Sequence, residues 1–218
     1  MGNQVAAISP ELNPVSKKAL ILVDRDGTIN QCPEGIYVTD INDFFEIPRA
    51  FEALVELRSI GHTAVITNQA KMSDSNGIII PEMLGKFTSI AMYIENCVRM
   101  IDKLTQERLW FYFCPHPEWM CCGCRKPDPG LLYEAVGRTH WDINDDIWII
   151  GDHYSDVLVA SRSGLPAVRT ILVQTGRGSD RDTVKFFQKN KGLRPTATVP
   201  SLWEASQYIK LHYVRSGK

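Results

Sequence analysis

Short runs of apolar, largely β-branched residues alternate with longer amphipathic segments along most of the chain. The short runs predict strands that are buried on both faces, because such strands show no alternation of polar and apolar side chains. The longer segments have the 3.6-residue spacing of helices that bury one face. The predicted strands are residues 19–23, 62–67, 107–113, 146–151 and 167–173, and the predicted helices are residues 49–60, 81–103, 130–139, 155–164 and 201–214.

The alternation of strand and helix predicts an α/β fold built on a doubly wound parallel sheet. The chain of 218 residues fits one domain over residues 19–218. Residues 1–18 contain two prolines and no apolar period, which predicts a flexible leader. Residues 175–200 are rich in Gly, Lys, Arg, Asp and Thr, and they predict a surface segment with one short helix at 183–188. In a sheet of this class, ligands bind beyond the carboxyl ends of the strands.

The charges of the chain are almost balanced, with 24 Lys and Arg against 25 Asp and Glu. This balance gives no reason to expect a nucleic-acid or membrane partner. No apolar stretch approaches the roughly 20 residues of a membrane span. The N-terminal segment lacks the basic and apolar regions of a secretory signal, so we expect a cytoplasmic protein. We also expect a monomer, since no pattern indicates an oligomer interface.

The predicted first strand is followed directly by Asp24-Arg25-Asp26-Gly27-Thr28, which puts two carboxylates two residues apart on a turn. A carboxylate is ionised at pH 7 and attacks phosphorus without a separate base. The neighbouring acid can protonate a leaving oxygen and later deprotonate a water molecule. Gly27 permits the tight turn. The alternative is an Asp-Gly turn with solvated side chains, but the position at the end of a buried strand favours chemistry.

An Asp-x-Asp-Gly-Thr segment after a first strand resembles the signature of the haloacid dehalogenase-like (HAD) phosphohydrolases. Three further segments resemble the other motifs of that family, in the same order. They are Ile66-Thr67-Asn68-Gln69, Arg125-Lys126-Pro127-Asp128-Pro129-Gly130 and Gly151-Asp152-His153-Tyr154-Ser155-Asp156. The resemblance implies a Rossmann-like fold and a phosphatase that forms an aspartyl phosphate. The catalytic residues that it implies are Asp24, Asp26, Thr67 and Lys126.

The same resemblance implies a magnesium site. Its protein ligands would be Asp24, the main-chain carbonyl of Asp26, and Asp152, with Asp156 as a supporting acid. Charge repulsion leads to the same expectation, because Asp24 and a phosphate dianion repel one another and Mg²⁺ neutralises both. Taken alone, Lys126 also fits a surface lysine after a turn, and Asp152 also fits the N-cap of the following helix.

Four of the six cysteines lie within eleven positions, together with one histidine. Cys114-x-His116 followed by Cys122-x-Cys124 supplies the four ligands of a closed tetrahedral Zn²⁺ site, and a closed site of this kind is structural. Cys121 is an alternative ligand to Cys122, and free buried thiols are the alternative to a metal site. We expect zinc to hold the loop that precedes the predicted catalytic lysine.

A Cys-x-His and Cys-x-Cys-Arg-Lys-Pro loop between the second and third motifs resembles one branch of the family more narrowly. This branch contains histidinol phosphatases and D-glycero-D-manno-heptose-1,7-bisphosphate phosphatases. Residues 24–30 and 35–38 resemble the heptose enzymes more closely, and the resemblance extends over residues 19–176. It implies a minimal cap, with a substrate pocket formed by residues 31–41 and by the zinc loop, residues 114–125.

The branch resemblance implies substrate contacts from Thr28, Asn68 and Arg125, the last of them to a distal phosphate or a sugar hydroxyl. Two segments depart from the heptose enzymes. Residues 70–77 read Ala-Lys-Met-Ser-Asp-Ser-Asn-Gly where those enzymes usually have Ser-Gly-Ile-Ala-Arg-Gly, and His153 stands where they commonly have Lys. A His153 that titrates near neutrality would make activity depend on pH, and a hydrogen-bonding histidine is the alternative.

The sequence therefore predicts a Mg²⁺-dependent phosphatase of carbohydrate metabolism that acts on a small sugar phosphate such as D-glycero-D-manno-heptose 1,7-bisphosphate. Histidinol phosphate is the alternative substrate. A polynucleotide 3′-phosphatase and a non-catalytic phospho-acceptor or binding domain are alternatives of other classes. The balanced charge argues against the former. The latter is disfavoured because Cys114, and not Asp, ends the predicted third strand.

Overall fold

The computed structural model describes residues 17–32, 38–102 and 108–216. Three sequence expectations lie at least partly outside these ranges. They concern the leader up to residue 16, residues 33–37 of the expected substrate loop, and residues 103–107, where a predicted helix ends and a predicted strand begins.

Six parallel strands form one sheet in the order β3-β2-β1-β4-β5-β6. The strands are β1 (Leu20–Val23), β2 (His62–Asn68), β3 (Trp110–Cys114), β4 (Ile147–Gly151), β5 (Val168–Val173) and β6 (Ala197–Val199). β1 pairs with β2 on one side and with β4 on the other. The chain therefore adds strands outward from β1 in one direction and then, from β4, in the other.

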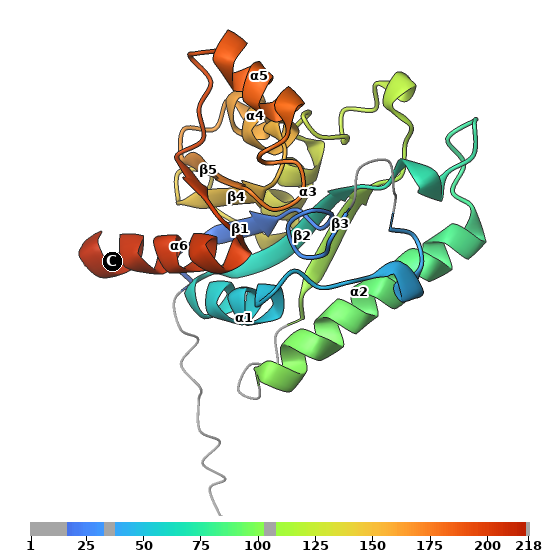
Figure 1. Cartoon of the computed structure of the whole chain (residues 1–218), viewed down its shortest axis with the longest axis horizontal. Coiled ribbons are helices and arrows are strands. Elements are labelled where there is room, and N and C mark those ends of the chain that lie inside the picture. The colour runs from blue at the N-terminus through green and yellow to red at the C-terminus, as the bar shows by residue number, and fades with distance from the viewer. Residues whose placement is uncertain (1–16, 33–37, 103–107, 217–218) are drawn as a thin grey trace, which may run out of the picture.

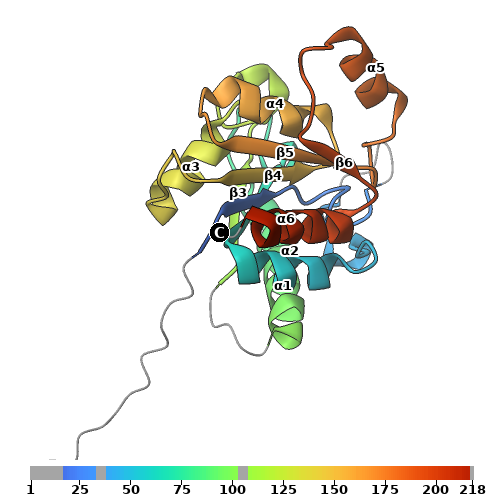
Figure 2. The same cartoon turned by 90° about the vertical axis from the view of Figure 1, so that its left-hand side faces the viewer.

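Helices cover both faces of this sheet, as Figure 1 and Figure 2 show. They are α1 (Ala50–Ile60), α2 (Pro81–Ile101), α3 (Gly130–Thr139), α4 (Tyr154–Ser163), α5 (Arg181–Lys189) and α6 (Leu202–Ser216). α1, α2 and α6 lie on one face, α3 and α4 lie on the other, and α5 packs against α4 and β5. Within the described ranges, no helix has both the length and the apolar character that crossing a membrane requires.

β1 is buried along its whole length, because none of its four side chains has exposed surface. Ile21 and Val23 pack with α1, α2 and α6, whereas Leu20 and Leu22 pack with α3 and α4. This burial on two faces is the physical reason for the unbroken apolar run in the sequence. Each side chain of this size stabilises the folded state by about 1.5–3 kcal/mol when fully buried. β1 is therefore a rigid support for whatever follows it.

The predicted α/β fold and parallel sheet are confirmed, and most predicted elements agree closely with the observed ones. The exception lies in residues 175–200, which contain the expected short helix, α5, but also the unpredicted strand β6. β6 pairs with β5 at the edge of the sheet and has only three residues, none of them fully buried. An edge strand of only three residues is too short to leave an apolar run or an alternation that the sequence pattern reveals.

The carboxyl ends of the six strands meet at one edge of the sheet. The connections after β1 and β4 diverge there, since β1 leads towards β2 and β4 leads towards β5. Neighbouring connections that diverge leave a crevice, which is the usual ligand site in sheets of this class. Asp24 directly follows β1 and Asp152 directly follows β4, so the predicted acidic residues flank this crevice.

Candidate active site

Asp24 and Lys126 form a buried ion pair at the carboxyl end of β1. The main-chain N–H of Asp24 donates to the Ile150 carbonyl at 2.8 Å, so the hydrogen bonding between β1 and β4 continues to this residue. Lys126 Nζ donates to the Asp24 carboxylate and also, at 3.1 Å, to the Ile66 carbonyl. Only 7% of Asp24 and 5% of Lys126 is exposed. The fold therefore brings together two predicted catalytic residues that are far apart in the sequence.

Asp152 and Asp156 add two carboxylates to the same point. Oxygen atoms of Asp24, Asp152 and Asp156 lie within 4.8 Å of one another, and Asp156 Oδ1 lies 2.7 Å from Lys126 Nζ. Burial raises the pKa of Asp24 to about 7, against the opposing effect of Lys126. Burial and the charge of Asp24 also raise the pKa of Asp152. One lysine cannot balance three buried carboxylates, so the cluster attracts a cation.

Two glycines make room for the Asp152 carboxylate. Gly27 and Gly176 have φ angles of +83° and +54°, which residues with a Cβ atom rarely adopt. At either position a Cβ atom would overlap the Asp152 carboxylate. The main-chain N–H of Arg177 donates to Asp152 Oδ2 at 2.6 Å. The loop after β5, for which no role was predicted, therefore helps to hold this predicted metal ligand.

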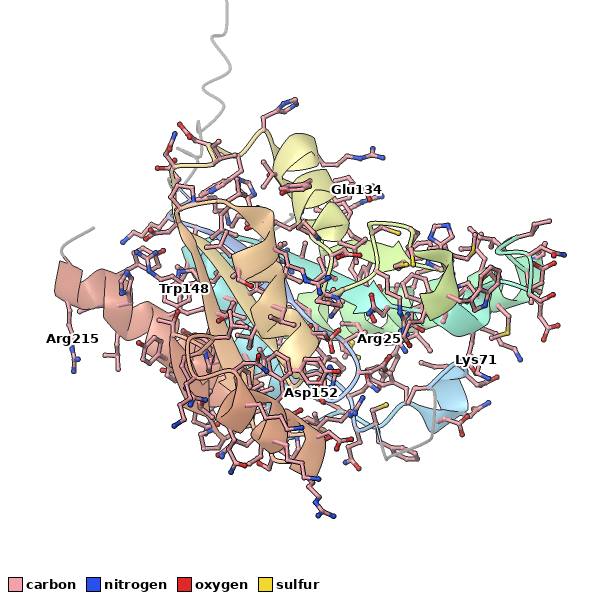
Figure 3. The ribbon with its side chains drawn as sticks, turned by 90° about the horizontal axis from the view of Figure 1, so that it is seen from above. Arg25, Lys71, Glu134, Trp148, Asp152 and Arg215 are labelled. Atoms are coloured by element: carbon pink, nitrogen blue, oxygen red, sulfur yellow. The ribbon has the colours of Figure 1, made fainter. Side chains whose placement is uncertain are left out.

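Asp26 is held by three side chains that donate to its carboxylate. The Arg25 guanidinium contacts both oxygens at 2.7–3.0 Å, Asn30 Nδ2 donates at 3.0 Å, and Gln69 Nε2 donates at 2.8 Å. Arg25 is itself buried and also donates to the Val38 carbonyl at 2.7 Å; Figure 3 shows Arg25 and Asp152 in the same region of the molecule. Arg25, Asn30 and Gln69 had no predicted role, although all three lie inside or next to the predicted motifs.

Thr67 and Asn68 are the last residues of β2, where they pair with Phe113 and Cys114 of β3. Thr67 is buried, and its Oγ1 accepts a hydrogen bond from Gln69 Nε2 at 2.9 Å. No other hydrogen bond involves this hydroxyl within the described part of the chain. Its own proton is therefore available to a ligand at the crevice.

The residues expected to contact substrate differ in their surroundings. Thr28 is fully buried, and its Oγ1 has no hydrogen-bond partner among the described residues, so its contact with substrate stays a prediction. The Asn68 amide forms two reciprocal hydrogen bonds with the main chain of Lys126, each 2.9 Å long, and thus fixes the lysine loop. Arg125 as a whole is partly exposed, whereas its Nη1 is buried and has no hydrogen-bond partner among the described residues. Of the three, Arg125 alone offers an unpartnered charged donor.

Cys114, His116, Cys122 and Cys124 converge on one point. The three sulfur atoms lie 3.2–3.5 Å apart, and His116 Nδ1 lies 3.2 Å from Cys124 Sγ and 3.6 Å from Cys114 Sγ. Four donors with such separations suit a tetrahedral metal ion, whose bonds to sulfur and nitrogen are about 2.0–2.3 Å long. Cys121 is exposed and is not part of this group.

Residues 70–77 fold against the zinc loop. They begin with a short 3-10 helix, η2 (Ala70–Met72), and the Ser73 hydroxyl then donates to the Pro115 carbonyl at 2.6 Å. Gly77 lies against Met120 so closely that a Cβ atom there would overlap the methionine side chain. This atypical segment therefore packs against the zinc loop and helps to set its conformation.

His153 is a capping residue of α4. Its Nδ1 accepts a hydrogen bond from the main-chain N–H of Ser155, and the main-chain N–H of His153 donates to the Asp156 carboxylate. Burial and then the charge of Arg177 lower the pKa of His153 to about 4. Of the two interpretations of His153, the hydrogen-bonding one fits its position, and the lowered pKa argues against titration near neutrality.

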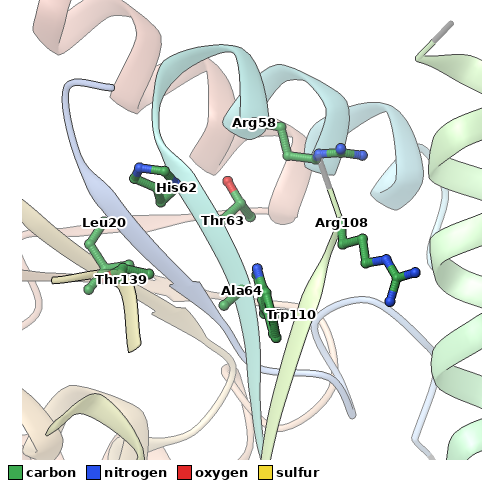
Figure 4. A pocket seen from close by; sticks show the side chains of 8 residues that line it. All are labelled: Leu20, Arg58, His62, Thr63, Ala64, Arg108, Trp110 and Thr139. Carbon is green, nitrogen blue, oxygen red and sulfur yellow. The ribbon is translucent and has the colours of Figure 1, made fainter. Parts of the chain in front are cut away.

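A separate cavity lies at the opposite edge of the sheet, where β1, β2 and β3 begin. Its volume is about 260 Å³, and Figure 4 shows the side chains that line it, among them His62, Ala64 and Trp110. None of the predicted site residues lines this cavity. The predicted chemistry is thus confined to the crevice at the carboxyl ends of the strands.

Comparisons with known proteins agree with this geometry. A family model described as HAD-hydrolase-like matches residues 123–205. The D-glycero-beta-D-manno-heptose-1,7-bisphosphate 7-phosphatase of Neisseria meningitidis is 30% identical over 196 residues, which cover 87% of this chain and 94% of the relative. The D-glycero-alpha-D-manno-heptose-1,7-bisphosphate 7-phosphatase of Mycobacterium tuberculosis is 31% identical, with 84% of this chain and 87% of the relative covered.

A solved structure has the same fold. It is a D,D-heptose 1,7-bisphosphate phosphatase from B. bronchiseptica in complex with magnesium and phosphate, with a TM-score of 0.71, 23% identity, and 89% of this chain and 99% of that chain covered. With the sequence identities to the Neisseria and Mycobacterium enzymes, this likeness establishes the relationship. The chain belongs to the HAD-like hydrolases, in the family that includes the heptose-1,7-bisphosphate phosphatases, and it is a phosphatase.

Proposed function

We propose that Asp24 is the nucleophile of a Mg²⁺-dependent phosphomonoesterase. The main support is the buried contact between Asp24 and Lys126, beside the carboxylates of Asp152 and Asp156. A fixed carboxylate next to an ammonium group is suited to attack a phosphoryl group, because the ammonium neutralises both reactants. The position of the pair at the end of β1, inside the crevice, agrees with this role.

The reaction proceeds in two halves. In the first, a carboxylate oxygen of Asp24 forms a bond to phosphorus, the bond from phosphorus to the leaving oxygen breaks, and Asp26 gives its proton to that oxygen. In the second, Asp26 takes a proton from a water molecule whose oxygen attacks phosphorus. The bond from phosphorus to Asp24 then breaks, which releases phosphate and restores both carboxyl groups. The Thr67 hydroxyl and the Lys126 ammonium stabilise charge on the phosphoryl oxygens.

The donor set fits a hard divalent cation. When all are ionised, three carboxylates and one ammonium carry a net charge of two negative units, which Mg²⁺ balances. Asp24, Asp152 and the main-chain carbonyl of Asp26 would hold the ion, while Asp156 contacts Lys126 and supports it. The bound cation neutralises nucleophile and phosphate. The magnesium in the B. bronchiseptica phosphatase supports this choice of metal.

The cysteine and histidine group fits a structural Zn²⁺ ion. Cys114, His116, Cys122 and Cys124 supply all four ligands, which leaves no open position for substrate. Cys124 is separated from Lys126 by a single residue, so a metal held here fixes the approach of the lysine to Asp24. We therefore assign this ion a structural role and no chemical step.

For the substrate we propose D-glycero-D-manno-heptose 1,7-bisphosphate, with Arg125 binding the phosphate that is not cleaved. The names of the relatives support this substrate class. The partly exposed Arg125, with an unpartnered Nη1, supplies the charge that a second phosphate needs. The relatives differ in the anomer that they are named for, alpha or beta, so both anomers belong in the test.

The test is phosphate release from both heptose bisphosphate anomers, other sugar mono- and bisphosphates, histidinol phosphate and a 3′-phosphorylated oligonucleotide. Each is measured with Mg²⁺ and with EDTA, for wild type, Asp24→Asn and Arg125→Ala. We expect Mg²⁺-dependent release from one heptose bisphosphate, and none from Asp24→Asn. Arg125→Ala should raise KM for the bisphosphate by roughly tenfold or more, since a lost charged hydrogen bond costs about 1.5–3 kcal/mol. Turnover that persists in a folded Asp24→Asn protein would refute the nucleophile.

A further inference from the structure

We propose that Gln69 is a positioning residue that orients both the Thr67 hydroxyl and the Asp26 carboxylate for the reaction. Its Nε2 lies 2.9 Å from Thr67 Oγ1 and 2.8 Å from Asp26 Oδ2. This inference rests on the proposed function, because it assigns a task to the group that connects the predicted phosphate ligand with the predicted acid and base.

The orientation of the Gln69 amide follows from its partners. Once Asp26 has protonated the leaving oxygen, its ionised carboxylate only accepts hydrogen bonds, so the amide nitrogen, and not the amide oxygen, faces Asp26. An amide nitrogen carries two protons, and the second is directed to Thr67 Oγ1. Gln69 therefore uses both of its N–H groups inside the crevice.

The consequence for Thr67 is directional. Its hydroxyl has one proton and accepts from Gln69, so the proton must point away from the Gln69 nitrogen. Since no other acceptor for this proton occurs in the described part of the chain, a phosphoryl oxygen in the crevice is its natural partner. Without Gln69, the hydroxyl rotates freely and donates in the required direction only part of the time.

The consequence for Asp26 is similar. Arg25 and Asn30 also donate to its carboxylate, but Gln69 binds Oδ2 from the side of β2, where Thr67 lies. The arginine contacts come from the neighbouring residue in the chain, so they fix the carboxylate within its own loop. Gln69 is the donor that ties this loop to the strand that carries the phosphate ligand.

The main chain holds Gln69 in place for this task. It directly follows β2, its N–H donates to the Cys114 carbonyl at 2.7 Å, and its carbonyl accepts from Met72 at 3.0 Å. Its side chain is buried, with 7% of the residue exposed. A glutamine side chain is costly to bury unless its donors are used. Both donors of Gln69 are used, because they bind Thr67 and Asp26, whose relative positions the proposed mechanism requires.

The test compares wild type with Gln69→Met, which keeps the length of the side chain but removes both donors. Two substrates separate the two consequences. The leaving group of p-nitrophenyl phosphate needs no protonation, whereas the sugar oxygen of heptose 1,7-bisphosphate does. Both substrates share the later step in which Asp26 deprotonates water, so the comparison uses kcat/KM, which reports the transfer of the phosphoryl group to Asp24. We expect kcat/KM to fall by roughly tenfold for the aryl phosphate through Thr67, and by roughly a hundredfold for the bisphosphate through Thr67 and Asp26 together.

The controls make each outcome decisive. Gln188→Met changes an exposed glutamine of α5 in the same way and should leave both kcat/KM values unchanged. If Gln69→Met fails to fold, Gln69→Asn keeps the amide but is too short to reach both partners, and the same difference between substrates is expected. An equal loss of kcat/KM on both substrates, or an unchanged kcat/KM, overturns the inference. A wild type without Mg²⁺-dependent turnover would instead refute the proposed function.

Discussion

Two polar clusters share one edge of the sheet, yet the chain holds them in different ways. The acidic cluster stands on strand ends: Asp24 continues the ladder between β1 and β4, and Asp152 follows β4. In the cysteine and histidine cluster, only Cys114 belongs to a strand, and the other ligands lie on the irregular loop that follows. The first cluster is positioned by main-chain hydrogen bonds and buried strands. The second depends on what binds its side chains.

The clusters also differ in what they bind. Three carboxylates with one lysine leave excess negative charge, which suits a hard cation that exchanges with solvent and substrate. Three sulfur atoms and one imidazole suit a softer ion in a closed shell. Lys126 connects the two clusters, because it lies two residues after Cys124 and ends in the acidic cluster. If the cysteine and histidine cluster loses its metal ion, we therefore expect the position of Lys126 in the acidic cluster to change.

The largest effect is expected from the cysteine cluster. Cys124→Ala should release the loop before Lys126 and lower kcat by roughly a hundredfold, because displacement of a catalytic group by about 1 Å can cost that much. Metal content and thermal unfolding are measured on the same preparation, and both should fall. Cys121→Ala is the matched control, since Cys121 is exposed and outside the ligand group. It should keep its zinc and its activity.

Two results would contradict the comparison. If Cys124→Ala loses zinc but keeps wild-type kcat, the loop does not position Lys126, and the two clusters are independent. If Cys121→Ala loses zinc while Cys122→Ala keeps it, the ligand set is different from the one the geometry favours. Only the first result would leave the acidic cluster as the whole of the catalytic architecture.

The difference between residues on strands and residues on loops also explains which features of the protein could be predicted from the sequence. The apolar runs of β1 and β4 predicted both the sheet and the meeting of Asp24 with Asp152, because strand burial leaves a direct pattern in the sequence. Nothing local indicated that Gln69 bridges Thr67 and Asp26, or that Arg177 holds Asp152, since such contacts exist only once distant loops meet.

The expected substrate contacts show the same limit. The branch resemblance implied that Thr28 and Asn68 bind substrate. The structure buries Thr28 completely, and the Asn68 amide forms hydrogen bonds with the main chain of Lys126. Proximity in sequence predicts which edge of the sheet a residue reaches. It does not predict which way the side chain turns there, because that depends on packing between loops.

A smaller effect is expected from Gly27→Ala, which tests how closely the acidic cluster is packed. The new Cβ atom would strain a backbone at φ +83°, at a cost of about 1–2 kcal/mol, and would push the Asp152 carboxylate aside. We expect the Mg²⁺ concentration that gives the half-maximal rate to rise roughly tenfold. Gly85→Ala, in α2 with open space around it, is the control. Equal Mg²⁺ dependence in both variants would show that the cluster tolerates displacement.

The smallest expected effect of a substitution is on the thermal stability of the protein when the acidic cluster holds no metal ion. Its measurement needs no substrate. Saturating Mg²⁺ should stabilise the wild type by about 2.7 kcal/mol at a hundredfold excess over Kd, measured as a rise in the thermal midpoint over an EDTA-treated sample. In EDTA, Asp152→Asn should have a higher thermal midpoint than wild type, because one buried charge is gone. With Mg²⁺, its midpoint should rise less than that of wild type. The asparagine oxygen can still accept from the Arg177 N–H, so packing is preserved.

The exposed Asp145→Asn is the control for a simple change in net charge, and it should behave as wild type in both conditions. The sign of the Asp152→Asn effect in EDTA is the informative quantity. A midpoint below that of wild type would mean that the three carboxylates are not in electrostatic conflict without metal. The acidic cluster would then be held by its hydrogen bonds alone, and the contrast with the metal-dependent cysteine loop would be sharper still.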